Sequence, residues 1–307
     1  MKPVVSIGNA NVDHFFVVER LPRKDEGVVA DEYYVAPGGS AGNFAVALAR
    51  LGINTRFIGY VGDDSDADFI INSFLKDGVD TSGIARVKEL PTGKVIILIE
   101  KSTGNKRMVA YRGANEYLLD KGINLDLIKN AEWIHISSVR VCATLNILKH
   151  AKKLGINTSY DPGASVLSKD AELIIKLAPL MDILFLNTRE LAILRRASGR
   201  KIVNLLLENG VSEVVVKKGE RGATVFTLNK KRHKNAFKVK CIDATGAGDA
   251  FNAGYIYATI KKLNIDDKLV IANAVAAIKV TRRGARSAPS LYEVVSFLKA
   301  RGIACRY

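Results

Sequence analysis

The run of residues with the clearest chemical potential is Asp243–Asn252, which reads Asp-Ala-Thr-Gly-Ala-Gly-Asp-Ala-Phe-Asn. Three small residues open a helix that we expect over 247–260: Gly246, Ala247 and Gly248. Unpaired N–H groups and the helix dipole favour a phosphate group at such a turn. Asp249 follows in the first helical turn, where its carboxylate can accept a hydroxyl proton beside the phosphate. This arrangement is the one that phosphoryl transfer to an alcohol requires. In the simpler alternative, Asp249 only stabilises the helix N-terminus.

A second glycine-rich segment could hold the acceptor. The pair Gly38–Gly39 opens another expected helix, and Asn43 lies on its first turn with an amide that can donate and accept. Asn11 and Asp13 follow the first expected strand and are two residues apart, so they lie on one face. Amide and carboxylate groups placed together suit a substrate with several hydroxyl groups.

Net charge raises a competing hypothesis. The formal charge is +15, and a nucleic-acid-binding protein would use such an excess to neutralise phosphates. The basic residues are spread along the chain, however, and the densest group, Lys230–Lys234, has the pattern of a solvated hairpin turn. Aromatic residues make up 7% and do not interleave with basic runs as a base-stacking surface requires. We therefore expect no nucleic-acid partner.

Membrane and secretory classes are not expected either. The longest apolar stretches, such as 44–49 and 95–99, are far too short to cross a bilayer, and the N-terminus does not follow a signal-peptide layout. Three scattered cysteines, Cys142, Cys241 and Cys305, are too few for a disulfide framework or a zinc site. These features predict a cytoplasmic protein. His14 and His135 are interpreted as structural rather than catalytic histidines.

Short apolar strands alternate with amphipathic helices over most of the 307 residues. This alternation predicts an α/β fold with a doubly wound, mostly parallel sheet and helices on both faces. The expected strands, besides one ending near Cys241, are Val4–Ile7, Thr55–Ile58, Trp133–Ile136, Thr158–Tyr160, Ile183–Leu186, Glu213–Val216 and Ala223–Thr227. Expected helices that end before a glycine are Asn43–Leu51, Phe69–Lys76, Leu145–Leu154 and Ile202–Glu208.

Two segments interrupt the alternation. Residues 14–35 and 93–112 have strand character on both sides of turn signals and contain no helical pattern. We expect them to pair into a small, discontinuous β-sheet lid over the carboxyl ends of the main strands, where doubly wound folds bind ligands. The catalytic core would then comprise residues 1–13, 36–92 and 113–307.

Gly38–Gly52 and Asp243–Ala258 together resemble the two signature motifs of the ribokinase-like carbohydrate kinases, the phosphofructokinase-B family. The resemblance runs through essentially the whole chain in the family's order and spacing. It implies ATP as the phosphoryl donor, Mg²⁺ as cofactor and Asp249 as the catalytic base. The backbone of Ala247 and Gly248 would form an anion hole. The two ribbons match the family's lid, which in ribokinases also forms a dimer interface, so a homodimer is expected.

Further positions are implied by the same resemblance. Asn187 and Glu190 match an Asn-x-x-Glu motif that helps to hold Mg²⁺, largely through water, although without the family Asn187 is an ordinary helix cap. The nucleotide-binding positions are Asn187, Glu190, Lys217, Gly219, Gly222 and Asn273. Asp243 and the main chain of Thr245 fall at a monovalent-cation site of the K⁺ type, supported by the loop Lys279–Ala285.

The acceptor is less narrowly defined. The positions that match sugar-binding residues are Asn11, Asp13, Gly38, Gly39, Ser40, Asn43 and Ser137. Ribokinases usually carry Lys at the position of Ser40 and a sugar-binding Glu near Ser137, so this chain departs from their pattern twice. D-ribose is the first choice of substrate, and a nucleoside is the alternative.

Two other classes fit poorly. A dehydrogenase would carry Gly-x-Gly-x-x-Gly after the first strand, and the segment Gly8–Asn11 does not match it. A pseudokinase would have lost its base, whereas Asp249 is present.

Overall fold

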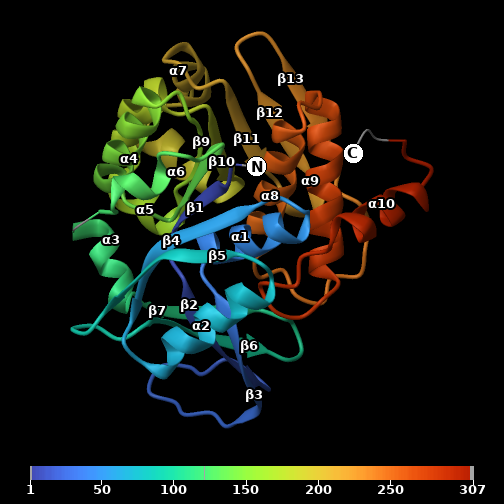
Figure 1. The fold of residues 1–307 in the computed structure, drawn as a ribbon. Helices are drawn as coiled ribbons and strands as arrows, with labels where there is room; N and C mark the ends of the chain where they lie inside the picture. The colour runs from blue at the N-terminus through green and yellow to red at the C-terminus, as the bar shows by residue number, and fades with distance from the viewer. Residues whose placement is uncertain (1, 121, 305–307) are drawn as a thin grey trace.

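The computed structural model describes residues 2–120 and 122–304, and within them the chain builds two sheets (Figure 1). The larger sheet has nine strands in the order β13-β12-β11-β10-β9-β8-β1-β4-β5. All neighbours are parallel except β11 with β12 and β12 with β13. Its strands are β1 Val4–Gly8, β4 Thr55–Gly62, β5 Asp80–Val87, β8 Trp133–Ser137, β9 Asn157–Asp161, β10 Ile183–Asn187, β11 Glu213–Lys217, β12 Ala223–Phe226 and β13 Lys231–Lys234.

Helices cover both faces of this sheet, as the alternation along the sequence predicts. The α-helices are α1 Ser40–Arg50, α2 Ser65–Lys76, α3 Tyr117–Asp120, α4 Val141–Lys153, α5 Gly163–Asp170, α6 Thr188–Ser198, α7 Ile202–Glu208, α8 Ala247–Ile260, α9 Ile265–Val280 and α10 Leu291–Lys299. In Figure 1, α4 to α7 cover one face, and α1, α8 and α9 cover the other. The described residues also contain four 3₁₀ segments: Gly113–Glu116, Leu125–Ile128, Ala171–Leu180 and Gly219–Arg221.

Strand β10 shows why both faces are filled. Ile183 and Phe185 belong to the core under α8 and α9, whereas Leu184 and Leu186 belong to the core under α4, α6 and α7. Successive strand residues point to opposite faces, so a strand that is apolar at every position must be covered twice. The doubly wound fold is therefore confirmed.

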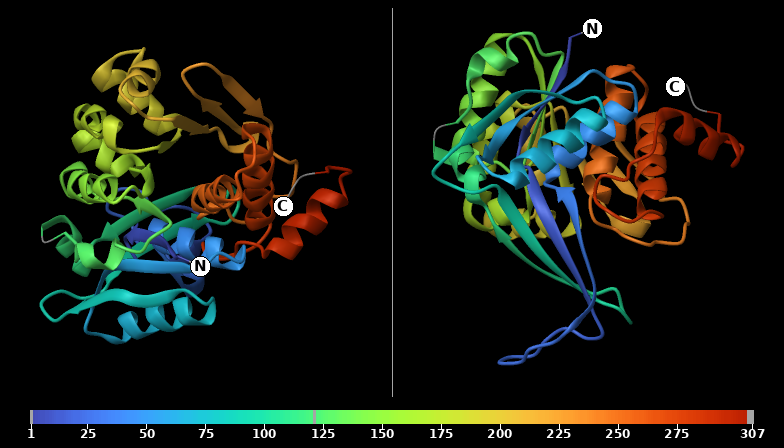
Figure 2. Two further views of the ribbon diagram at one scale, coloured as in Figure 1. Left: turned by 45° about the horizontal axis from the view of Figure 1, so that its top comes forward. Right: turned by 60° about the horizontal axis from the view of Figure 1, so that its bottom comes forward.

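The second sheet has four strands in the order β3-β2-β6-β7 and projects from the body of the molecule (Figure 2). Its strands are β2 Asn11–Val18, β3 Ala30–Gly38, β6 Gly93–Glu100 and β7 Lys106–Tyr111. The hairpins β2/β3 and β6/β7 are antiparallel, and β2 pairs with β6 in parallel. Two ribbons distant in sequence thus form a small separate sheet, and β2 begins at Asn11 rather than after Asp13.

Three expectations about local structure are wrong. The described backbone has no strand near Cys241; instead, Ile242 and Asp243 donate backbone N–H bonds to Val280 O at the end of α9. Residues 231–234 form β13 rather than a turn, because their backbone pairs with β12. Asn11 and Asp13 start a strand of the small sheet instead of ending the first strand of the large one.

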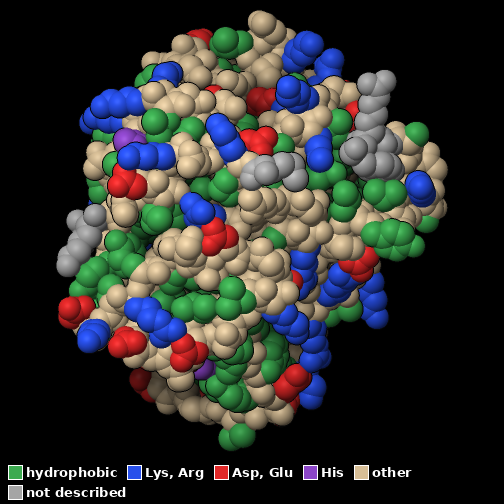
Figure 3. Space-filling model, viewed as in Figure 1, with side chains coloured by type: hydrophobic (Ala, Val, Ile, Leu, Met, Phe, Trp, Pro, Cys, Tyr) green, Lys and Arg blue, Asp and Glu red, His purple; other side chains and the backbone are tan. Residues whose placement is uncertain are grey.

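The surface agrees with the charge pattern of the sequence. In Figure 3, Lys and Arg side chains are scattered over the visible face and mixed with Asp and Glu over most of it. Within residues 2–120 and 122–304, no helix is long and apolar enough to cross a membrane. Cys142 and Cys241 are exposed free thiols, and Cys305 lies outside the described residues.

Candidate active site

A cavity of about 430 Å³ lies between the small sheet and the first turns of α1 and α8. Among the residues expected to bind substrate or catalyse, seven line it: Asn11, Asp13, Gly39, Ser40, Asn43, Gly246 and Asp249. These residues come from β2, from the start of α1 and from the start of α8. The fold therefore brings together two glycine-rich segments that are about two hundred residues apart in the chain, as expected from their sequence alone.

Asp249 is held by Asn43 across this cavity. Asn43 Nδ2 donates to Asp249 Oδ2 at 2.8 Å. Burial raises the pKa of Asp249 to about 6, although the hydrogen bond from Asn43 acts to lower it. The carboxylate is therefore poised to take a proton near neutral pH. Asn43 Oδ1 is buried and has no hydrogen-bond partner among the described residues, so it remains open to a ligand.

Asp13 is a second acid at the cavity. Its side chain is buried, and Oδ1 has no hydrogen-bond partner in the described structure. Burial raises its pKa to about 7, against the nearby positive charge of Arg286. A Cβ atom added to Gly38 would lie 2.0 Å from Asp13 Oδ2, so only glycine at position 38 lets this carboxylate take its place.

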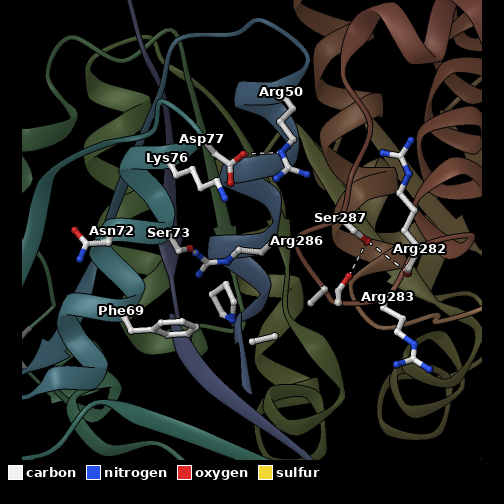
Figure 4. Close-up of a pocket in the computed structure, with 14 residues that line it drawn as sticks. Arg50, Phe69, Asn72, Ser73, Lys76, Asp77, Arg282, Arg283, Arg286 and Ser287 are labelled. Atoms are coloured by element: carbon white, nitrogen blue, oxygen red, sulfur yellow. Dashed lines mark hydrogen bonds and ion pairs between the residues drawn. The ribbon is translucent and has the colours of Figure 1, made fainter. Parts of the chain in front are cut away.

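Arg286 holds the segment that contains Gly38 in place. Its Nη2 donates to Gly38 O at 2.9 Å. Its Nη1 donates to Ser73 Oγ at 2.5 Å, which ties the segment after α9 to α2 (Figure 4). The guanidinium lies over the ring of Phe74 at 4.1 Å, and burial lowers its pKa to about 9. No sequence motif marks Arg286, so it was not among the expected site residues.

The other expected substrate positions differ in their surroundings. Asn11 Oδ1 accepts a 2.9 Å bond from Asn115 Nδ2, which fixes its amide. Ser137 Oγ is buried without a hydrogen-bond partner among described atoms, and Ser138, not Ser137, lines the cavity. Arg112 also lines the cavity, and its Nη1 is buried with no hydrogen-bond partner in the described structure.

A second cavity, of about 560 Å³, opens on the other side of the same turn. Four of the residues expected to bind nucleotide line it: Lys217, Gly219, Gly222 and Asn273. Ala247 and Gly248 line it too, while Gly246 and Asp249 face the first cavity. Phe237, Val239 and Phe251 supply apolar walls, which suit a flat heterocycle.

The turn between the cavities has the expected shape. Gly246 caps α8 with a left-handed backbone, φ 76°, and an added Cβ would lie 2.5 Å from Ala285 O. Glycine is therefore required there. Ala247 N–H points back to Ala244 O at 3.2 Å, so the N–H groups of Gly248 and Asp249 are the first that the helix leaves without a backbone acceptor.

A buried cluster sits beneath this turn. Lys217 Nζ donates to Asp161 Oδ2 at 2.5 Å and to Asn252 Oδ1 at 3.1 Å, and Asn252 Nδ2 donates to Asp161 Oδ2 at 2.6 Å. Although burial acts to lower it, the charges of Asp161 and Glu190 hold the pKa of Lys217 above its usual value. Sequence reasoning missed Asp161 and Asn252, although Asn252 lies three residues after Asp249, on the same side of α8.

Asn187 and Glu190 form a capping box at the start of α6. Glu190 N donates to Asn187 Oδ1 at 2.9 Å, and Asn187 N donates to Glu190 Oε2 at 2.7 Å. Burial and the charge of Asp161 raise the pKa of Glu190 to about 7. Within the described residues no group of three or more His, Cys, Asp or Glu forms a ready-made metal site. A buried acid that lacks a full counter-charge nevertheless fits Mg²⁺ that keeps its water shell and arrives with phosphates.

The expected monovalent-cation position already holds an ammonium group. Lys106 Nζ, from β7, donates to Asp243 Oδ1 and to Thr245 Oγ1, each at 2.7 Å. Lys279 Nζ donates to Asp243 O at 2.7 Å, and Gly284 N donates to Asp243 Oδ2 at 3.0 Å. Although burial acts to raise it, hydrogen bonds from Lys106 and Thr245 hold the pKa of Asp243 well below its usual range.

His14 and His135, which were expected to be structural, line neither cavity. His135 is fully buried, stacks on Phe44 with ring centroids 3.9 Å apart and shares a 2.9 Å hydrogen bond with Ser159 Oγ. Burial lowers its pKa to about 3, so it stays neutral. His14 stacks on Tyr33 in the small sheet.

Comparison with known proteins decides the family, since residues 1–291 match the pfkB family carbohydrate kinases. The chain belongs to this family. It is 30% identical to a ribokinase of Haemophilus influenzae over 97% of this chain and 99% of the relative. It is 34% identical to an ATP-dependent ribose-1-phosphate kinase of Halopiger xanaduensis over 98% of this chain and 99% of the relative. As a pfkB family member it is a phosphotransferase that acts on an alcohol group.

Solved structures of two ribokinases and a nucleoside kinase have the same fold. A Thermotoga maritima ribokinase superimposes with a TM-score of 0.86 at 31% identity, covering 97% of this chain and 100% of that one. A Methanocaldococcus jannaschii nucleoside kinase gives 0.88 at 26% identity, covering 98% and 99%. An Arabidopsis thaliana ribokinase complexed with ribose and ATP gives 0.85 at 27% identity, covering 97% and 99%.

Proposed function

We propose that this chain is an ATP-dependent ribose kinase that uses Asp249 as its general base. One observation carries the proposal: the turn Gly246–Asp249 separates two cavities, one lined by amide and carboxylate side chains and one with apolar walls. A phosphoryl group that passes from nucleotide to acceptor would cross this turn. The donors of the turn stay in place throughout, so they can stabilise the negative charge of the transferring group.

The chemistry follows from the position of Asp249. Its carboxylate takes the proton of the acceptor hydroxyl, the hydroxyl oxygen forms a bond to the γ-phosphorus, and the bond to the leaving ADP breaks. Asn43 orients the carboxylate through its 2.8 Å bond. Closure of the small sheet over the cavity would exclude water, which otherwise competes as an acceptor. We propose accordingly that residues 14–35 and 93–112 act as a lid on the remaining core.

The donor side is assigned in the same way. We propose that ATP binds against Lys217, Gly219, Gly222 and Asn273, with its triphosphate at the start of α8. Mg²⁺ would be held near Asn187 and Glu190, largely through water, where it supplies positive charge to the phosphates. The structure of the Arabidopsis thaliana ribokinase with ATP supports ATP as the co-substrate.

Ribose is favoured by the open acceptors of the first cavity. Asn43 Oδ1 and Asp13 Oδ1 are buried without partners in the described structure, and sugar hydroxyls would satisfy both. A buried polar group without a partner costs about 1–3 kcal/mol, so a polyol that supplies the missing bonds is preferred. The ribokinases among the relatives support this choice.

A second candidate is a ribose that already carries a phosphate group. Arg112 Nη1 is a buried donor at the cavity with no hydrogen-bond partner in the described residues, and Arg is well suited to phosphate oxygens. The Halopiger xanaduensis relative is named for this substrate class. The nucleoside alternative draws support from the Methanocaldococcus jannaschii fold and from the small side chain of Ser40 at the cavity.

A coupled assay of ADP release with MgATP tests these candidates directly. The panel contains ribose, ribose 1-phosphate, fructose, adenosine, inosine, guanosine and cytidine. We expect ribose to give the largest kcat/KM and Asp249→Asn to lower kcat by at least about 10²-fold, the usual effect of losing a general base. Near-normal turnover by Asp249→Asn would refute the role of Asp249. A preference for ribose 1-phosphate that Arg112→Gln abolishes would replace ribose by the second candidate.

We also propose a homodimer through the outer face of the small sheet. Strand register places Val35, His14, Ile96 and Val109 in one row across the four strands. Ile96 and Val109 are 46% and 70% exposed, which is unusual for neighbouring apolar side chains of a monomer. Light scattering of the purified protein should give twice the chain mass, and Val109→Glu should yield the monomer. A wild-type monomer at all concentrations would refute the interface.

A further inference from the structure

We propose that the Lys106 ammonium is a built-in replacement for the monovalent cation, so that this kinase needs no K⁺. The inference rests on the proposed function, because it assigns a positioning role at the same anion-binding turn. It also departs from the resemblance of the sequence to its family, which implies a K⁺-type site at Asp243 and Thr245.

The Asp243 carboxylate oxygen that a cation would use is already engaged, and so is the neighbouring Thr245 hydroxyl. Lys106 Nζ lies 2.7 Å from both Asp243 Oδ1 and Thr245 Oγ1. Thr245 Oγ1 in turn donates to Asp243 Oδ1 at 2.7 Å, so the three groups form a closed triangle. K⁺ binds to rings of oxygen atoms, and it cannot share these two oxygens with a lysine head group at hydrogen-bond distance.

The positive charges already present also argue against a bound K⁺ ion. Lys279 Nζ is fully buried and donates to the carbonyl of the same Asp243 at 2.7 Å. Asp243 therefore faces two ammonium groups, and Gly284 N–H occupies its other carboxylate oxygen. A third positive charge at this point would be repelled by two like charges at close range. The residues present do not fit K⁺.

Position explains what the ammonium does. Thr245 directly precedes Gly246, the residue that caps α8 and shapes the turn between the two cavities, and Asp243 lies three residues before it. Lys106 fixes the side chains on which that turn rests and adds a positive charge beneath it. Both effects stabilise the negative charge of a transferring phosphoryl group, as a bound cation would otherwise do.

The source of Lys106 adds a coupling to the small sheet. Lys106, Met108 and Ala110 alternate along β7 and so lie on one face, and Met108 and Ala110 line the acceptor cavity. The Lys106 bonds therefore connect the sheet that covers the acceptor to the turn that binds the phosphoryl group. When the small sheet closes over the acceptor, it would also bring the positive charge of Lys106 to the turn.

The test compares wild type, Lys106→Met and Lys101→Met in choline chloride and in KCl at equal ionic strength, since equal ionic strength removes general screening effects. Lys101 is the matched control: it lies in the turn between β6 and β7 of the same small sheet, but its side chain is 60% exposed and pairs with Asp31 and Glu19 at the surface. We expect wild type and Lys101→Met to turn over equally well, to within about twofold, in both salts, and Lys106→Met to lose at least about tenfold in choline. KCl should restore part of the activity of Lys106→Met only.

Thermal unfolding supplies a readout that needs no turnover. The melting temperature of Lys106→Met should be higher in KCl than in choline chloride, because an ion that binds only the folded protein stabilises it, whereas wild type should show no difference. Specific activation or stabilisation of wild type by K⁺ would overturn the inference, as would a Lys106→Met enzyme that is fully active without K⁺. If no acceptor is phosphorylated under any condition, the proposed function fails, and the melting data alone then decide the inference.

Discussion

Replacing Asn43 with alanine should move the acid limb of the pH–rate profile to higher pH. Asn43 Nδ2 donates a 2.8 Å hydrogen bond to the Asp249 carboxylate. Burial raises the pKa of Asp249 to about 6, and this bond is the first influence that acts to lower it. Without it, the carboxylate holds its proton more tightly, and a protonated Asp249 cannot act as a base.

The size of the shift follows from the bond. A hydrogen bond to a charged group is worth about 1.5–3 kcal/mol, and one pKa unit corresponds to about 1.4 kcal/mol. The pKa of Asp249 should therefore rise by about one to two units, to between about 7 and about 8. At pH 7 roughly nine-tenths of the wild-type enzyme would have an ionised base, compared with roughly a tenth to a half of the variant.

The measurement is kcat/KM for ribose at saturating MgATP, from about pH 5 to about pH 9, because this ratio reports the ionisation of the free enzyme. Asn72→Ala, on the exposed side of α2, is the matched control and should leave the profile unchanged. Loss of Asn43 should also raise KM, because its Oδ1 is an open acceptor at the cavity. A higher KM lowers kcat/KM at every pH but does not move the acid limb along the pH axis. A limb that stays in place or moves to lower pH would refute the assignment of Asp249 and its partner.

Three further predictions concern neighbouring groups. Gly38→Ala should raise KM for ribose by at least about tenfold, because its Cβ would displace the Asp13 carboxylate 2.0 Å away; Gly27→Ala, which meets nothing within 4 Å, is the control. Lys217→Met should raise KM for ATP and lower the melting temperature by several degrees, since it leaves a buried carboxylate without its counter-charge. Asp13→Asn should abolish most activity yet stabilise the unliganded protein, and a thermal melt at about pH 8 and about pH 5 checks this.

The sign of the last effect comes from linkage. Burial raises the pKa of Asp13 from an ordinary 3.8 to about 7, so the folded state holds this proton more tightly than the unfolded chain. Stability then falls as the pH rises between these two values, and the full cost is present above about pH 7. Asn carries no such charge, so its stabilising effect should be larger at about pH 8 than at about pH 5. A variant that is less stable than wild type at both pH values would contradict the argument.

The sequence predicted those parts of the site that depend on the backbone. A glycine that must adopt a left-handed conformation, as Gly246 does, and a helix that starts directly after it leave a local pattern that can be recognised without the fold. The same holds for Gly38–Gly39 and α1. Short runs of consecutive apolar residues likewise predicted most strands of the large sheet, because those strands are covered on both faces.

Partners supplied by tertiary contact could not be predicted. Lys106 meets Asp243 across 137 positions of sequence, and Lys217 meets Asp161 across 56. A lysine in a strand of a small sheet looks like any solvated surface residue until the packing shows which carboxylate it reaches. The expected strand near Cys241 failed for a related reason: alternating apolar residues there, such as Phe237 and Val239, line the second cavity instead of pairing in a sheet.

Three carboxyl groups around the cavities have raised pKa values: Asp13 and Glu190 at about 7 and Asp249 at about 6. In each case burial is the largest cause, so the free protein bears an electrostatic cost where its ligands would bind. Strongly perturbed pKa values of this kind cluster at sites where charged groups act on a ligand. Sugar hydroxyls would supply the missing donors to Asp13, and a hydrated metal ion with its nucleotide would supply the missing charge near Glu190. Ligand binding should therefore raise the free energy of unfolding, because the ligands complete interactions that the chain alone leaves unpaired.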